Sequence, residues 1–129
     1  MRAAKGVTII ELVVILVFLG VLLSFAAPAY FHSKRNAQDT MAQSQLRLVG
    51  DAEKMFRLQS RVYAPCGATV ECNVALGLDL ASAASMGGYW DYSVAVDGDT
   101  FCAQAVAPDS ARKWHVTHEA IEPAAGGCP

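Results

Sequence analysis

The pattern of apolar and polar positions begins with a long apolar run. The uncharged segment Leu12–Ala29 has 18 residues and is interrupted only by Gly20, Ser24 and Pro28. At about 1.5 Å per residue, a helix of this length crosses most of the hydrocarbon core of a bilayer. The pattern therefore predicts a membrane-spanning helix, with a transmembrane segment at about residues 9–31.

The helical pattern continues beyond this run. Between Ala37 and Val62, apolar residues recur near helical spacing and charged residues occupy the positions between them. The predicted apolar face consists of Met41, Leu48, Val49, Ala52, Met55, Phe56 and Val62. The predicted polar face consists of Asp39, Arg47, Asp51, Glu53, Lys54, Arg57 and Arg61. We therefore expect one helix from about Ile9 to Arg61, whose apolar first half must be covered by other copies outside a bilayer.

After Tyr63, the pattern changes to a loop with small side chains and then to strand-like alternation. Strands are predicted at residues 89–96, 100–106 and 113–117, with a turn at Asp97-Gly98-Asp99. The expected fold class is α+β, with the long N-terminal helix packed on a small antiparallel sheet of three to four strands. Three aromatic residues are expected to fill the helix–sheet interface rather than bind a ligand: Trp90, Tyr92 and Trp114.

Glu11 lies just inside the apolar region and carries the most chemical information. A carboxylate in lipid costs roughly 3 kcal/mol, so this side chain requires a partner. If the chain were cut between Gly6 and Val7, the new α-amino group of Val7 would be a cation at the same depth. The cation and the carboxylate could then neutralise each other, within one chain or between neighbouring chains.

The N-terminal residues resemble the type IV pilins and the pseudopilins of type II secretion, whose precursors carry a short basic leader that ends in Gly. The positions that match, over roughly the first thirty residues, are Gly6, Thr8, Glu11, the apolar run, Gly20 and Pro28. Val7 departs from the family, which more often has Phe or Met there. The resemblance implies that a prepilin peptidase cuts after Gly6, that the new amino terminus is methylated, and that Glu11 and Thr8 serve assembly.

The same resemblance implies a structural subunit of a type IV pilus or pilus-like filament with a pilin-like fold. Its expected partners are prepilin peptidase, other pilin subunits in a homo-oligomeric helical filament, an inner-membrane assembly platform and the membrane. The expected location is the bacterial inner membrane before assembly, with the amino terminus inside, and then the periplasm and a cell-surface filament. In relatives, the stretch that matches Gly20 to Pro28 can unwind. Pro28 cannot donate to the carbonyl of Ser24, so the helix is expected to kink or loosen there.

Two alternatives remain open. The chain could be a pseudopilin of a type II secretion system. In a different class, it could be a secreted disulfide-bonded binding domain, with residues 1–27 as a signal peptide whose basic region contains Arg2 and Lys5. In the favoured interpretation, residues 1–6 are a leader peptide, 7–62 form the long helix and 63–129 form a globular head.

All four cysteines follow the apolar run: Cys66, Cys72, Cys102 and Cys128. An even number in a small exported domain indicates two disulfides and an oxidising compartment. Four cysteines allow three connectivities. We favour a short loop closed by Cys66 and Cys72, and a second bond from Cys102 to Cys128, which also resembles the C-terminal closure of pilins. A zinc site with His115 and His118 is the rival use, but the sequence has no CxxC pair.

The remaining chemistry is sparse. The formal net charge is −2, or −4 without residues 1–6, with no basic stripe, so nucleic acid is not predicted as a general partner. Asp97 and Asp99 are explained by turn geometry. The family resemblance implies that a major pseudopilin holds calcium in an acidic loop near its C-terminus, and this C-terminal segment lacks the clustered carboxylates that calcium requires. Together with the disulfide-closed C-terminal segment, this favours a pilin over a pseudopilin. No nucleophile or phosphate-binding motif is present, so we expect no enzyme activity and no cofactor.

Overall fold

The computed structural model describes residues 6–82 and 88–129. It contains helices α1 (Ile9–Ser60) and α2 (Thr69–Leu76), followed by strands β1 (Asp91–Asp97), β2 (Thr100–Val106), β3 (Lys113–Thr117) and β4 (Ala124–Ala125). The predicted α+β class, with a long N-terminal helix on a small antiparallel sheet, is confirmed. The chain divides into two compact units, Met1–Ala37 and Gln38–Pro129, and we call the second the head unit. The basic residues of the expected leader, Arg2 and Lys5, lie outside the described residues.

In the first unit, α1 begins at Ile9 and continues through Gly20 and Pro28. The hydroxyl of Ser24 donates a hydrogen bond to the carbonyl oxygen of Gly20 at 2.8 Å, one turn earlier in the helix. The helix is continuous across Pro28, and a kink or loosening at this residue stays a prediction.

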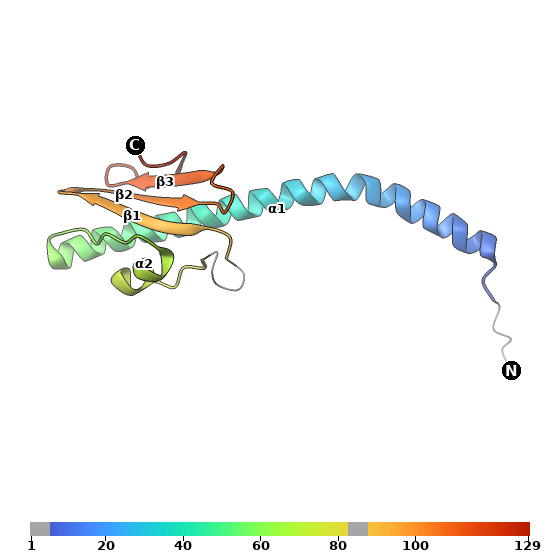
Figure 1. The fold of residues 1–129 in the computed structure, drawn as a ribbon, viewed down its shortest axis with the longest axis horizontal. Coiled ribbons are helices and arrows are strands. Elements are labelled where there is room, and N and C mark those ends of the chain that lie inside the picture. Colours follow the sequence, from blue (N-terminus) through green and yellow to red (C-terminus); the bar gives the residue numbers. More distant parts are fainter. Residues whose placement is uncertain (1–5, 83–87) are drawn as a thin grey trace. The chain divides into compact units, whose positions relative to one another are not determined.

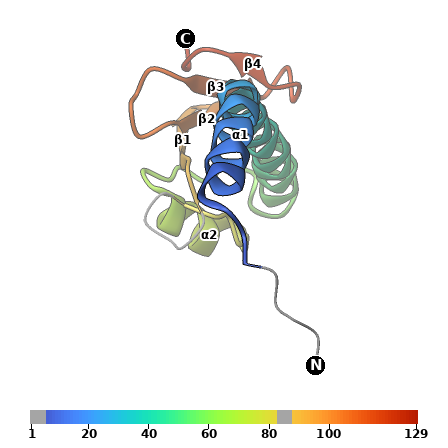
Figure 2. The same cartoon turned by 90° about the vertical axis from the view of Figure 1, so that its right-hand side faces the viewer.

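The head unit contains a four-stranded antiparallel sheet in the order β1-β2-β3-β4. Asp97 pairs with Thr100 across a tight turn, where Gly98 has φ 58°, a conformation that favours glycine. Figure 1 shows the sheet alongside the second half of α1, with α2 next to β1. Figure 2 shows β4 at the other edge of the sheet, beside β3. The first strand begins at Asp91, two residues later than predicted.

The core lies between the sheet and α1. Trp90 is 0% exposed and Tyr92 1% exposed, and both belong to the same buried cluster as Leu46 and Val49 of α1. Trp114 is partly buried and packs against this cluster. The prediction that these three aromatic residues fill the helix–sheet interface is confirmed.

The predicted apolar face of α1 is wrong in part. The residues of α1 that are buried are Ala42, Leu46, Val49, Gly50 and Glu53. Leu48 and Met55 were expected in the core but are 54% and 61% exposed. This half of the helix carries two apolar stripes, and only the stripe that faces the sheet is buried. The other stripe lines a groove of about 510 Å³ with residues of α2 and the segment after it.

Helix α2 occupies a region that the sequence pattern assigned to a loop. The helix ends at Gly77, which has φ 65° and donates its backbone N–H to the carbonyl oxygen of Asn73. A glycine in this left-handed conformation is a common helix terminator, so Gly77 was the signal that the sequence offered.

Two disulfides connect the head unit, Cys66–Cys72 and Cys102–Cys128. They are the two pairs favoured above. Cys66 also exchanges backbone hydrogen bonds with Val94 of β1, at 3.1 and 2.8 Å. Within residues 6–82 and 88–129, no cluster of three or more His, Cys, Asp or Glu side chains is arranged to hold a metal ion. Because all four sulfur atoms are bonded to one another in pairs, they offer no thiolate ligands for zinc.

Candidate assembly site

The first turn of α1 brings together the two polar residues assigned to assembly. The hydroxyl oxygen of Thr8 accepts the backbone N–H of Glu11 at 3.3 Å, and the Thr8 carbonyl accepts the N–H of Leu12 at 3.1 Å. Thr8 thus caps the N-terminus of α1, and the spacing Thr-x-x-Glu is that of a capping box. Sequence reasoning missed this role, although the spacing could have indicated it. Gly6 and Val7 precede the helix and are exposed, and the assembly role of Thr8 and Glu11 stays a prediction.

The apolar part of α1 is uncovered. Its large apolar side chains, together with Val7, range from 47% exposed at Val14 to 86% at Ile9, as far as Phe31. Helix α1 is long and apolar enough to cross a membrane, by length and composition, and none of its most apolar window is buried. A signal sequence near an amino terminus would pass the same test. Exposed apolar area costs roughly 25 cal/mol per Å², so these side chains require lipid or protein around them.

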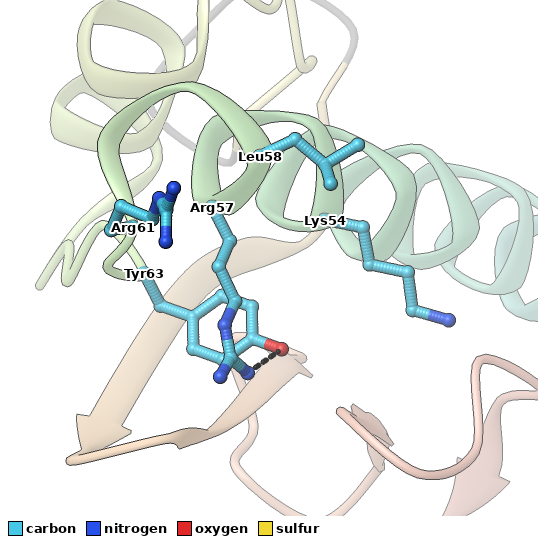
Figure 3. A pocket seen from close by; sticks show the side chains of 5 residues that line it. All are labelled: Lys54, Arg57, Leu58, Arg61 and Tyr63. Atoms are coloured by element: carbon cyan, nitrogen blue, oxygen red, sulfur yellow. Dashed lines mark hydrogen bonds between the residues drawn. The ribbon is translucent and has the colours of Figure 1, made fainter.

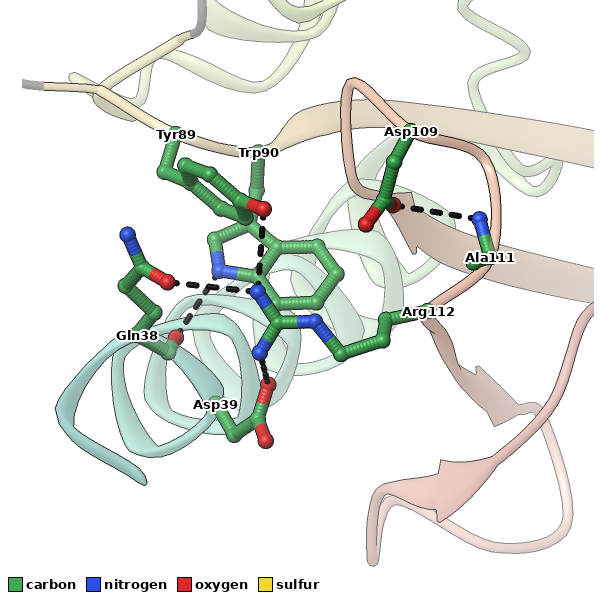
Figure 4. Close-up of polar contacts among 7 residues, drawn as sticks. All are labelled: Gln38, Asp39, Tyr89, Trp90, Asp109, Ala111 and Arg112. Carbon is green, nitrogen blue, oxygen red and sulfur yellow. Dashed lines mark hydrogen bonds and ion pairs between the residues drawn. The ribbon is translucent and has the colours of Figure 1, made fainter. Parts of the chain in front are cut away.

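Arg112 lies in the connection between β2 and β3. It holds the turn of α1 at Gln38 and Asp39, where the head unit begins (Figure 4). Its guanidinium donates to Asp39 Oδ1 at 2.9 Å, to Gln38 Oε1 at 3.2 Å and to the Tyr89 hydroxyl at 2.9 Å. The indole N–H of Trp90 donates to the Gln38 carbonyl oxygen at 2.8 Å. The Arg112–Asp39 ion pair is only about one-quarter exposed, so solvent screens it less than a surface pair. Sequence reasoning gave no sign of this cluster.

Glu53 is a fully buried carboxylate near the C-terminal end of α1. Its Oε2 accepts the backbone N–H of Ala64 at 2.9 Å, which ties the helix to the segment that leads into the first disulfide. Its Oε1 has no hydrogen-bond partner in the described part of the chain. Burial raises the pKa of Glu53, and the bond from Ala64 opposes this only in part. Sequence analysis placed Glu53 on the polar face, which is wrong because this helix position faces the sheet.

We expect Glu53→Gln to stabilise the head unit at neutral pH. A raised pKa means that the folded state binds the proton more tightly than the unfolded state, so stability falls as pH rises from the ordinary carboxyl range through the raised value. Glutamine keeps an acceptor for Ala64 and removes the buried charge, but it places amide N–H groups where Oε1 has no partner, so the gain above that range should be about 1 kcal/mol. Urea unfolding between pH 4 and 8, followed by tryptophan fluorescence, measures both effects.

Glu71→Gln is the matched control for this variant. Glu71 Oε2 accepts the backbone N–H of Gly67 at 2.7 Å, but the side chain is exposed. The control keeps an acceptor for Gly67 and removes no buried charge, so it should not stabilise the head unit at neutral pH. A Glu53→Gln profile that matches the parent profile would refute the assignment of this pH dependence to Glu53.

Comparison with known proteins gives one partial similarity. No protein-family model matches this chain, and no solved structure matches it. The type II secretion system core protein G of Vibrio cholerae serotype O1 is 33% identical over 63 residues, which cover 49% of this chain and 43% of that protein. The chain therefore spans less than half of the length of this relative.

Proposed function

We propose that this protein is a structural subunit of a type IV pilus or pilus-like filament, processed after Gly6 and assembled through α1. The observation that carries the proposal is an uncovered apolar helix whose first turn holds a single carboxylate, Glu11. A monomeric protein in water has no use for such a helix, whereas a subunit that moves from a membrane into a helical bundle needs it in both places.

In this proposal, residues 1–6 are the leader, 7–62 form the assembly helix and 63–129 form the globular head. Two disulfides favour a head on the oxidising side of the bacterial inner membrane, with the amino terminus in the cytoplasm. Prepilin peptidase and an inner-membrane assembly platform are the proposed partners, and the assembled subunit passes through the periplasm into a filament.

Assembly would rest on two kinds of contact. Glu11 would pair with the α-amino group of Val7 in a neighbouring subunit, which removes an uncompensated charge from an apolar environment. The apolar part of α1 would be covered by the same part of other copies. The stretch from Gly20 to Pro28, with two poor helix formers, would be the place where the helix can lengthen under load.

A pseudopilin of a type II secretion system is the second candidate. The observation that favours it is the similarity to the type II secretion system core protein G. Both candidates share the processing site, the membrane helix and the assembly chemistry. They differ in the machine that extends the filament.

The intact mass and amino-terminal sequence of the protein from its native host test the proposal. We expect a methylated chain that starts at Val7, in the membrane or in the sheared-surface fraction. Gly6→Ala should leave the leader attached. A chain that starts near Pro28 or Ala29 would refute the filament subunit and favour the secreted domain with a signal peptide.

A further inference from the structure

One pocket collects half of the basic side chains of the head unit. The pocket has a volume of about 880 Å³ and is lined by Lys54, Arg57, Leu58, Arg61 and Tyr63 (Figure 3). Residues 38–129 contain six Lys and Arg but eleven Asp and Glu, so the head unit has a formal charge of −5. We call this cavity the basic pocket. It groups three cations in a unit whose net charge is negative.

Arg57 forms the fixed wall of the basic pocket. Its guanidinium lies 4.8 Å from the centre of the Tyr63 ring and donates to the Tyr63 hydroxyl at 2.9 Å. It also donates to the carbonyl oxygen of Asp99 at 3.1 Å and to Asp99 Oδ1 at 2.9 Å. The ion pairs of the described residues include neither Lys54 nor Arg61. Lys54 and Arg61 thus line the pocket without a carboxylate as an ion-pair partner among the described residues.

The backbone of Arg61 gives a second reason to assign a role to this pocket. Arg61 has φ 65°, a left-handed conformation in which glycine or asparagine is the usual residue after a helix. The helix dipole favours a cation near this end and accounts for Arg57 in the last turn. It does not require a long side chain at a strained position, where glycine would fit better. Strain of this kind concentrates at functional sites.

Because every copy of the chain carries the same basic pocket, the positive charge of this pocket limits which surface of another copy can bind there. A two-fold contact centred on the basic pocket would bring like charges together, which is unfavourable. A copy must therefore present a different, acidic part of its surface. Such a contact between two different surfaces either closes into a ring or propagates as a filament.

Two exposed aspartates, Asp91 and Asp109, lie at the opposite end of the head unit, near Arg112 and Lys113; Asp109 Oδ1 also accepts the backbone N–H of Ala111 at 3.1 Å. Asp91 begins β1 directly after Trp90, which bonds to Gln38, and Asp109 lies in the connection whose Arg112 bonds the same turn of α1. Both carboxylates are exposed. Along α1, the distance from Gln38 to Lys54 is about 24 Å at 1.5 Å per residue. The basic pocket and these two carboxylates thus lie at opposite ends of the head unit.

We propose that the basic pocket binds the carboxylates of Asp91 and Asp109 of a second copy of this chain. The inference rests on the proposed filament and names the contact that orders its heads from one end to the other. Lys54 and Arg61 supply the charges, and Arg57 with Tyr63 supplies a rigid wall.

A carbodiimide, which joins lysine to a carboxylate in direct contact, tests this contact in sheared filaments. We expect mass spectrometry to find Lys54 linked to Asp91 or Asp109. Within one chain these residues are too far apart for a bond without a spacer, so each such link joins two copies. Arg61→Glu should reduce the yield of the link about tenfold or more, because it places like charges together. Asp91→Arg combined with Arg61→Glu should restore the link between Lys54 and Asp109.

Two controls keep the outcomes separate. Lys54→Arg preserves the charge and should keep filaments while the link disappears, and Lys113→Arg, an exposed lysine outside the pocket, should leave the link unchanged. Filaments in which Lys54 is unlinked, or linked to other carboxylates, would overturn this inference and leave the filament proposal standing. A chain that starts near Pro28 and forms no filament would overturn the proposed function itself.

Discussion

Replacement of Glu11 by alanine is expected to abolish filaments and leave processing at Gly6 largely intact. The peptidase acts on residues before the helix, whereas the carboxylate is needed only once the amino terminus of Val7 has been released. Without it, each added subunit would bring an unpaired α-ammonium into an apolar environment, where an isolated charge costs roughly 3 kcal/mol or more. Electron microscopy of sheared material measures filaments, and the intact mass measures processing.

The capping box at the start of α1 offers a competing explanation, which two variants separate. Glu11→Gln retains a residue that suits a capping box but removes the charge. Thr8→Ala removes the hydroxyl that accepts the Glu11 N–H, which should cost about 1 kcal/mol of helix stability. Pairing through charge predicts that Glu11→Gln loses filaments more completely than Thr8→Ala, which keeps the carboxylate. Normal filaments from Glu11→Gln would mean that the carboxylate serves only to start the helix.

Trp90→Ala is expected to remove a large part of the stability of the head unit. The side chain is 0% exposed, and its truncation should cost about 3–5 kcal/mol through lost burial and the cavity left behind. The variant also loses the 2.8 Å bond to the Gln38 carbonyl and one of the rings beside Arg112. Domains of this size are commonly stable by only about 5–15 kcal/mol. Urea unfolding followed by the fluorescence of Trp114 measures the change.

Trp114→Ala is the matched control, because this residue is only partly buried against the same cluster. It should cost clearly less than Trp90→Ala, with Trp90 as the fluorescent probe. Trp90→Phe should fall between them, since it keeps most of the buried ring and loses the hydrogen bond. Equal losses at Trp90 and Trp114 would contradict the assignment of Trp90 as the centre of the core.

The elements with one strong period could be predicted from the sequence. The uninterrupted apolar run predicts the first half of α1, and strict alternation at Trp90, Tyr92 and Val94 predicts β1 to within two residues. Both patterns depend only on residues that are close together along the chain, so the sequence alone is enough to recognise them. The rotation of the second half of α1 could not be predicted, because it has two apolar stripes and only the tertiary contact with the sheet selects one.

The buried polar contacts could not be predicted for a similar reason. Glu53 and Ala64 are 11 residues apart, and Arg112 meets Asp39 across 73 positions. A charged residue on a helix is normally expected to face solvent. Only the position of its hydrogen-bond or ion-pair partner in the folded structure shows that its charge can be buried. The cap at Thr8 and the helix end at Gly77 are different, because both follow from local spacing and were available in the sequence.

The contacts of Gln38 and Asp39 also determine how the head unit would bear mechanical force. A pull transmitted along α1 would enter the head unit at this turn, where the Arg112 fork and the Trp90 indole bond hold it. Because these bonds act in parallel, they share the load and must break nearly together. Tension would therefore reach the sheet at two places, the connection between β2 and β3 that holds Arg112 and the start of β1 beside Trp90, so that neither strand would carry the load alone.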